Sequence, residues 1–161
     1  MLLNVIFGSL ACLSLALLLW QWLVAWRFPV HQRASDVSFA PAVTLLKPLK
    51  GCDASTEDCL RSWFKQQYPG PTQILFGVAS ATDPVIDVVR KLIGEHPDRD
   101  AELIACGDLP GANAKVSKLA ELEKLAKHEV LVVSDADVRV PPDFLAHAVA
   151  ALGRGRYASC R

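Results

Sequence analysis

Val130-Leu131-Val132-Val133-Ser134-Asp135-Ala136-Asp137 is the stretch that decides the fold of this 161-residue sequence. Its four leading apolar residues predict a short buried strand. The two carboxylates that follow stand one residue apart, and side-chain alternation at a strand end would aim both in the same direction. Paired oxygen ligands suit a hard divalent ion, which can bridge to a diphosphate. The alternative is that one aspartate caps the next turn and the other is solvated.

Three more apolar runs predict strands at residues 42–46, 73–79 and 102–105. The intervening helices are expected to begin at Ser55 (with Asp58 at the capping-box position), at Asp83-Pro84, at Val116 and near Pro142. Strands that alternate with helices of about ten residues indicate an α/β fold, a parallel sheet with helices on both faces. In such a sheet, ligands lie beyond the carboxyl ends of the strands.

Asp83 ends the loop after the second predicted strand, at the edge of the sheet where Asp135 and Asp137 are also expected. Its carboxylate could accept hydrogen bonds from the base of a bound nucleotide. The alternative is that Asp83 caps the helix that begins at Pro84. The residues alone leave both interpretations open.

The loop Gly111-Ala112-Asn113-Ala114-Lys115 precedes a predicted helix, whose first backbone N–H groups can face an anion. Lys115 could then contact a phosphate; otherwise Asn113 simply starts the helix and Lys115 is solvated. Lys47 and Lys50 flank the proline that ends the first strand. Each either helps to hold a nucleotide or is a surface charge.

Residues 2–26 contain no charged side chain and are long enough to cross a bilayer of about 30 Å as a helix. Tryptophans gather at the end of this segment, where indole rings favour the membrane interface. Arg27 and Arg33 follow it, so the positive-inside rule predicts a single-pass membrane protein whose remaining chain is cytoplasmic. A cleaved signal peptide is the alternative, but the basic start is missing and the apolar core is too long.

Composition excludes several classes of function. The 17 basic and 17 acidic residues balance, so no overall field attracts nucleic acid. The five cysteines are odd in number and none forms a CxxC pair, which argues against a zinc site or a disulfide framework. There is no glycine-rich phosphate loop, GxGxxG fingerprint or Ser-His-Asp order.

Taken together, these stretches resemble the ceramide glucosyltransferase family and its bacterial relatives, including the hopanoid-associated glycosyltransferases. The resemblance rests on the apolar first segment, VTLLKPLKGCD from Val43, QQYPG from Gln66, ATDPVIDVV from Ala81, GANAKVSKL from Gly111 and SDADVRVPPDFL from Ser134. LLKPLKG and the GxNxK loop are the specific motifs, whereas many nucleotide-sugar transferases share the DxD.

The resemblance implies a GT-A nucleotide-sugar-binding sheet, a UDP-sugar donor, a divalent metal (Mg²⁺ or Mn²⁺), inversion at the sugar carbon and a membrane lipid acceptor. It implies that Asp83 lies near the uridine, and that Asp135 and Asp137 occupy the metal and diphosphate motif. Lys47, Asn113 and Lys115 complete the expected donor site.

The family pattern continues with a third aspartate, thought to be the catalytic base, and a (Q/R)xxRW motif, which this sequence does not contain. We therefore expect an anchor at 1–27, a linker at 28–41, the N-terminal half of a GT-A domain at 42–152 and an atypical tail at 153–161. No catalytic residue is identified, so we expect a truncated product with little turnover alone. Two alternatives stay open: a non-catalytic nucleotide-sugar-binding fragment and a relative of processive polysaccharide synthases.

Overall fold

The computed structural model describes residues 2–27, 34, 36–107 and 113–154, which divide into two units. The first unit contains the single helix α1 (Leu2–Arg27). Its segment Leu3–Arg27 has a mean hydropathy of 2.1, and its length and composition suffice to cross a membrane. Residues 28–33 and 35 of the expected linker, and 155–161 of the expected tail, lie outside the described residues.

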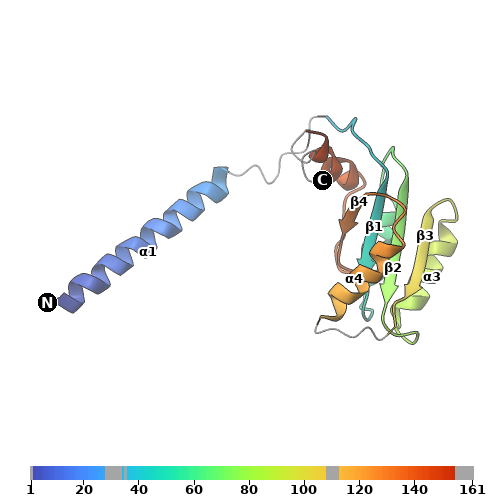
Figure 1. The fold of residues 1–161 in the computed structure, drawn as a ribbon, viewed down its shortest axis with the longest axis horizontal. Coiled ribbons are helices and arrows are strands. Elements are labelled where there is room, and N and C mark those ends of the chain that lie inside the picture. The colour runs from blue at the N-terminus through green and yellow to red at the C-terminus, as the bar shows by residue number, and fades with distance from the viewer. Residues whose placement is uncertain (1, 28–33, 35, 108–112, 155–161) are drawn as a thin grey trace. The chain divides into compact units, whose positions relative to one another are not determined.

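The second unit is built on a parallel sheet whose four strands lie in the order β3-β2-β1-β4 (Figure 1). The strands are β1 (Val43–Pro48), β2 (Thr72–Val78), β3 (Asp100–Ala105) and β4 (Val130–Val133). The helices are α2 (Thr56–Phe64), α3 (Val85–Glu95), α4 (Ala114–Lys124) and α5 (Phe144–Ala150), followed by the short 3-10 helix η1 (Leu152–Arg154). The α/β parallel sheet predicted from the sequence is confirmed.

Helices cover both faces of this sheet. The larger core lies under α2, α3 and α5, where Leu45 and Phe76 from the strands pack with Phe64 from α2. On the other face α4 lies across β1 and β2 (Figure 1), and its Leu122 contacts a smaller cluster that includes Leu46. Leu45 and Leu46 serve opposite faces because successive strand side chains alternate. Each fully buried side chain of this size contributes about 1.5–3 kcal/mol.

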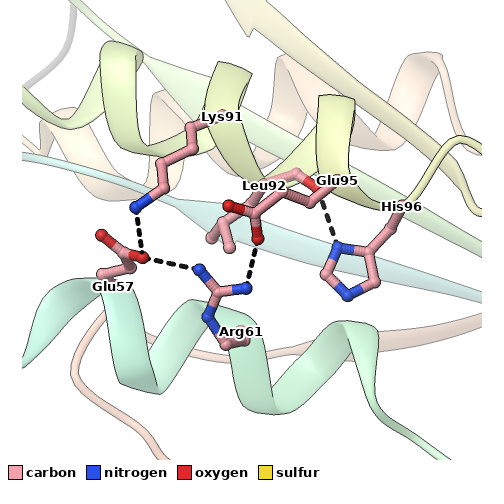
Figure 2. A network of polar contacts seen from close by, with 6 residues as sticks. All are labelled: Glu57, Arg61, Lys91, Leu92, Glu95 and His96. Atoms are coloured by element: carbon pink, nitrogen blue, oxygen red, sulfur yellow. Dashed lines mark hydrogen bonds and ion pairs between the residues drawn. The ribbon is translucent and has the colours of Figure 1, made fainter.

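Helices α2 and α3 are joined by a network of ion pairs (Figure 2). Arg61 lies between Glu57 and Glu95 and pairs with both, and the Lys91 ammonium lies 2.8 Å from the Glu57 carboxylate. These side chains are partly exposed, so solvent screening makes each pair a weak contribution to stability. The network fixes one side of α2 against α3.

Two local features differ from the sequence prediction. The capping box expected at Ser55 and Asp58 is wrong, because Ser55 makes no side-chain bond to the start of α2. Instead Asp53 accepts hydrogen bonds from the Ser55 N–H (2.9 Å) and the Thr56 hydroxyl (2.8 Å). In addition, β1 continues two residues beyond its predicted end and includes Lys47 and Pro48.

Strand β4 pairs only with β1 among the described strands, so its other side is an open edge of the sheet. Leu131 and Val133 on this strand are 36% and 52% exposed. They share the α4 face of the sheet with Leu46, which pairs with Val133 in register. The last described strand therefore presents both an unpaired backbone edge and exposed apolar side chains.

Candidate functional site

Strand β1 separates two acidic loops at the carboxyl edge of the sheet. Its neighbours are β2, which is followed by Asp83, and β4, which is followed by Asp135 and Asp137. Because the strands are parallel, their carboxyl ends meet at one edge. The three aspartates predicted from the sequence therefore lie along that edge, on the two sides of the end of β1.

Asp83 connects the loop after β2 to the loop after β1. Its two carboxylate oxygens accept the Gly51 N–H at 3.1 and 3.0 Å, and one of them also accepts the Val85 N–H at 3.1 Å. Gly51 has a φ of +70°, a conformation that favours glycine. The carboxylate thus bonds the first residue of α3, as the capping interpretation required, although Pro84 holds the cap position and the helix starts one residue later than predicted.

Lys47 is fully buried beneath the loop that follows β4. Its ammonium donates to the Ser134 hydroxyl at 3.1 Å and to the Asp135 carbonyl at 2.9 Å, and lies 4.3 Å from the centroid of the Trp63 ring. Burial lowers the pKa of Lys47 to about 7, and the nearby Asp135 charge opposes that shift. The interpretation of Lys47 as a surface charge is wrong, whereas Lys50 is exposed.

The start of α4 meets the loop after β4 through an ion pair. The Lys115 ammonium lies 2.5 Å from the Asp135 carboxylate, and both side chains are about half exposed. Asn113 caps α4, since its side-chain oxygen accepts the N–H groups of Lys115 (3.1 Å) and Val116 (3.3 Å). The helix-start interpretation of Asn113 is confirmed, and α4 begins at Ala114, two residues before the predicted start.

Lys118 belongs to the same edge but was not singled out from the sequence. It is 6% exposed, and its ammonium donates to the Leu49 carbonyl at 2.5 Å, just past the end of β1. Burial lowers its pKa, while the Cys106 and Asp83 groups oppose the shift. One sequence signal was available: Lys118 precedes Leu122 by four residues and therefore lies on the buried face of α4.

A cavity of about 350 Å³ lies beside the free edge of β4. It is lined by Trp63, Lys115, Val132, Val133, Ser134, Asp135, Val138 and Phe144. Most of these walls are apolar, whereas the Lys115–Asp135 pair supplies charge. The cavity could therefore hold a ligand that is partly apolar and partly anionic.

The metal expected from the sequence must be held by few protein groups. Among the described residues, no cluster of three or more His, Cys, Asp or Glu side chains is suitable for a metal ion. Asp135 and Asp137 offer two exposed carboxylates. Mg²⁺ is commonly held by one or two carboxylates, with phosphate oxygens and water completing its coordination. Asp135 and Asp137 therefore fit a divalent ion that binds together with a diphosphate.

The parallel sheet with acidic loops at its carboxyl edge defines the chain as a domain of the GT-A glycosyltransferase type. The mannosyltransferase PcManGT from Pyrobaculum calidifontis, solved in complex with GDP-Man and Mn²⁺, matches with a TM-score of 0.69 and 26% identity. That match covers 86% of this chain and 40% of the other. The sequence model of glycosyl transferase family 21 matches residues 6–159, and the chain belongs to this family.

Curated relatives with this sequence pattern are ceramide glucosyltransferases. The Candida albicans enzyme is 34% identical over 74% of this chain and 24% of its own length. The Komagataella phaffii enzyme is 34% identical over 91% of this chain and 32% of its own length. The chain thus spans about a quarter to a third of the length of these relatives.

Proposed function

We propose that this chain supplies the donor-binding part of an enzyme that transfers a sugar from a UDP-sugar to a membrane lipid. The acceptor would be a ceramide-like or hopanoid-like lipid with a free hydroxyl group. One observation carries the proposal: both acidic loops are tied to β1 or to the loop that follows it, through the Lys47–Asp135 and Gly51–Asp83 hydrogen bonds. Family membership supports the sugar-transfer chemistry.

In this proposal the uracil ring lies against Asp83. The carboxylate is half-buried and already accepts two backbone N–H groups, which fixes its orientation. A uracil imino N–H would be a further donor to it, and a site that bonds a particular N–H rejects bases that lack it. Asp83 would thus favour a base that presents such an N–H, as uracil does, over cytosine and adenine, which lack it.

The diphosphate would lie between the start of α4 and the loop after β4. Asn113 holds the first turn of α4, and Lys115 stands in that turn within reach of Asp135. A phosphate that displaced the Asp135 carboxylate from Lys115 would gain a cation and leave Asp135 free for a metal. The ion pair would therefore keep both groups in place before the donor arrives.

Asp135 and Asp137 would hold the Mg²⁺ or Mn²⁺. When bound, the ion supplies positive charge against the departing nucleotide diphosphate. Lys47 would act from the buried side of the loop, since its bond to the Asp135 carbonyl fixes the backbone that carries the first carboxylate. Inverting transfer also needs a base for the acceptor hydroxyl, and we assign that role to none of the described residues.

The apolar helix α1 would tether the domain at the membrane that holds the acceptor. We propose that α1 crosses the bilayer once and that the domain lies on the cytoplasmic side, because positively charged residues follow the helix. A tethered domain meets its lipid acceptor at a high effective concentration.

The test is calorimetric titration of the full chain in detergent with UDP, with and without Mn²⁺. We expect binding that needs the metal and is abolished by EDTA. Asp135→Ala should remove the metal-dependent part, whereas Asp98→Ala, which changes an exposed carboxylate at the opposite edge of the sheet, should leave it unchanged. Metal-dependent binding that survives Asp135→Ala would contradict the metal assignment.

The two alternatives from the sequence are distinguished by their products. A radiolabelled UDP-sugar incubated with a full-length relative and a lipid acceptor should give a lipid bearing one sugar if the proposal holds. A polymer would indicate a processive synthase. Donor binding without any product in the full-length relative as well would indicate a non-catalytic binding module.

A further inference from the structure

One face of α2 holds the segment that follows the DxD aspartates. Cys59, Ser62, Trp63 and Gln66 recur at helical spacing on α2 and the turn after it, and all are buried. Their contacts run along residues 137–145: Cys59 Sγ to the Asp137 carbonyl (3.3 Å), Trp63 Nε1 to the Val138 carbonyl (3.0 Å), the Val140 N–H to Ser62 Oγ (3.1 Å), Gln66 Nε2 to the Pro141 carbonyl (2.8 Å) and the Leu145 N–H to Gln66 Oε1 (2.9 Å).

These contacts provide hydrogen-bond partners for the backbone of a segment that has no regular secondary structure. Residues 138–141 form neither helix nor strand, so their backbone groups need partners elsewhere. Pro141 and Pro142 contribute no N–H group. The polar side chains of α2 supply the hydrogen-bond partners that a neighbouring strand would otherwise supply. Their positions therefore determine the path of the backbone after Asp137.

Trp63 links this face of α2 to the candidate site itself. Its N–H bonds the Val138 carbonyl, its ring faces the Lys47 ammonium, and Lys47 in turn bonds the Asp135 carbonyl. The backbone carbonyls of Asp135, Asp137 and Val138 are therefore each held from the buried side. Both carboxylates of the DxD remain exposed, and that of Asp135 pairs with Lys115.

We propose that Trp63 and Gln66 are positioning residues for the metal–diphosphate site, which fix the backbone that presents Asp135 and Asp137. This inference rests on the proposed function, because it names what the positioned carboxylates bind. Neither residue would be a ligand of the metal. They act through the backbone, as outer partners do for the ligands of other metal sites.

The experiment compares Gln66→Met with a control that destabilises the fold elsewhere. Gln66→Met keeps the volume but removes the amide contacts to Pro141 and Leu145, together with the bond from Gln66 Nε2 to the Ser62 carbonyl. Leu92→Val shortens a fully buried side chain on α3. Both variants should unfold at a lower temperature than the unsubstituted chain. Well below those temperatures, the affinity for UDP with Mn²⁺ should fall about tenfold in Gln66→Met alone.

Amide hydrogen exchange without ligand gives a second measurement. In Gln66→Met the Leu145 and Val140 amides should exchange faster, whereas in Leu92→Val they should not exchange faster than the rest of the core. Trp63→Phe keeps a ring beside Lys47 and removes one N–H, so it should produce a smaller loss of affinity. Ser62→Ala, which removes the acceptor for the Val140 N–H and the hydroxyl bond to the Cys59 carbonyl, replaces Gln66→Met if that variant does not fold.

Three outcomes would overturn the inference. An unchanged UDP and Mn²⁺ affinity in Gln66→Met would show that the contacts serve stability only. An equal loss in Leu92→Val would attribute the effect to general destabilisation. Absence of metal-dependent UDP binding in the unsubstituted chain would reject the donor site, and this role with it; that failure is distinct because it appears before any substitution.

Discussion

The Lys47 ammonium lies 4.3 Å from the centroid of the Trp63 ring and is fully enclosed by protein. Its two hydrogen bonds go to Ser134 and to the backbone of Asp135, so no carboxylate touches it directly. A buried ammonium without a direct counter-ion is costly, which is why its pKa is lowered.

Lys47 should make stability depend on pH. Its pKa is about 7 in the folded chain, against the ordinary lysine value of 10.5 that applies once the chain unfolds, so between these values the unfolded chain holds the extra proton. The free energy of unfolding should therefore rise with pH across this window, by up to about 1.4 kcal/mol per pH unit. Denaturant titrations at pH 7, 8 and 9 in EDTA check this, comparing the chain with Lys47→Met. The free energy of unfolding of the unsubstituted chain minus that of Lys47→Met should rise with pH. If this quantity stays constant from pH 7 to pH 9, the prediction is contradicted.

Lys115→Met should weaken UDP binding while it changes the stability of the fold little. The Lys115–Asp135 pair is half exposed, so its loss should change the free energy of unfolding by less than about 1 kcal/mol. UDP binding should nevertheless weaken, because a phosphate partner is removed. Calorimetry and thermal unfolding on one preparation measure both. Lys124→Met, which removes an exposed lysine from the far end of α4, is the matched control and should change neither.

Asp83→Asn should separate the capping role from the proposed base-binding role. Asparagine keeps one oxygen that can accept the Val85 or Gly51 N–H, so stability should fall by less than in Asp83→Ala, where about 1–2 kcal/mol is expected. The loss of the carboxylate charge should still weaken UDP binding. Full UDP affinity in Asp83→Asn would show that the carboxylate only holds the loops together.

Gly70→Ala and Gly94→Ala should change stability in opposite directions. A Cβ at Gly70 would lie 2.4 Å from the Ala40 carbonyl oxygen, a backbone atom that cannot move aside easily, so a loss of at least about 2 kcal/mol is expected. A Cβ at Gly94 meets nothing within 4 Å and lies within α3, where alanine gains about 0.5–1 kcal/mol over glycine. Denaturant unfolding of the two variants provides the comparison.

The sequence predicted the parallel sheet and the acidic loops at its carboxyl edge because those features depend on local patterns. The apolar run before Asp135 marks a strand, and parallel connectivity is enough to place Asp83 at the same edge. The alternative in which Asn113 starts the helix is confirmed for the same reason, since a cap is a contact within three residues, although α4 begins at Ala114 and not at Val116.

The features that sequence reasoning missed depend on distant contacts. The sequence left Lys47 open between a nucleotide contact and a surface charge, because nothing nearby in the sequence shows that Trp63 and Ser134 would enclose it. The partners of Gln66 and Cys59 lie 75 to 79 residues away along the chain. The spacing of Lys118 to Leu122 indicated its buried face, but its acceptor is a backbone carbonyl, which leaves no mark in the residue types.

The central position of β1 restricts the insertions and deletions that the chain can tolerate. A one-residue insertion or deletion within this strand would exchange its two faces, moving Lys47 from beneath Trp63 to the side of α4 and Leu46 into its place. The bonds from Lys47 to Ser134 and Asp135 would then be lost together. Length variation should therefore be tolerated in the turn between α3 and β3 far more readily than in the six residues of β1.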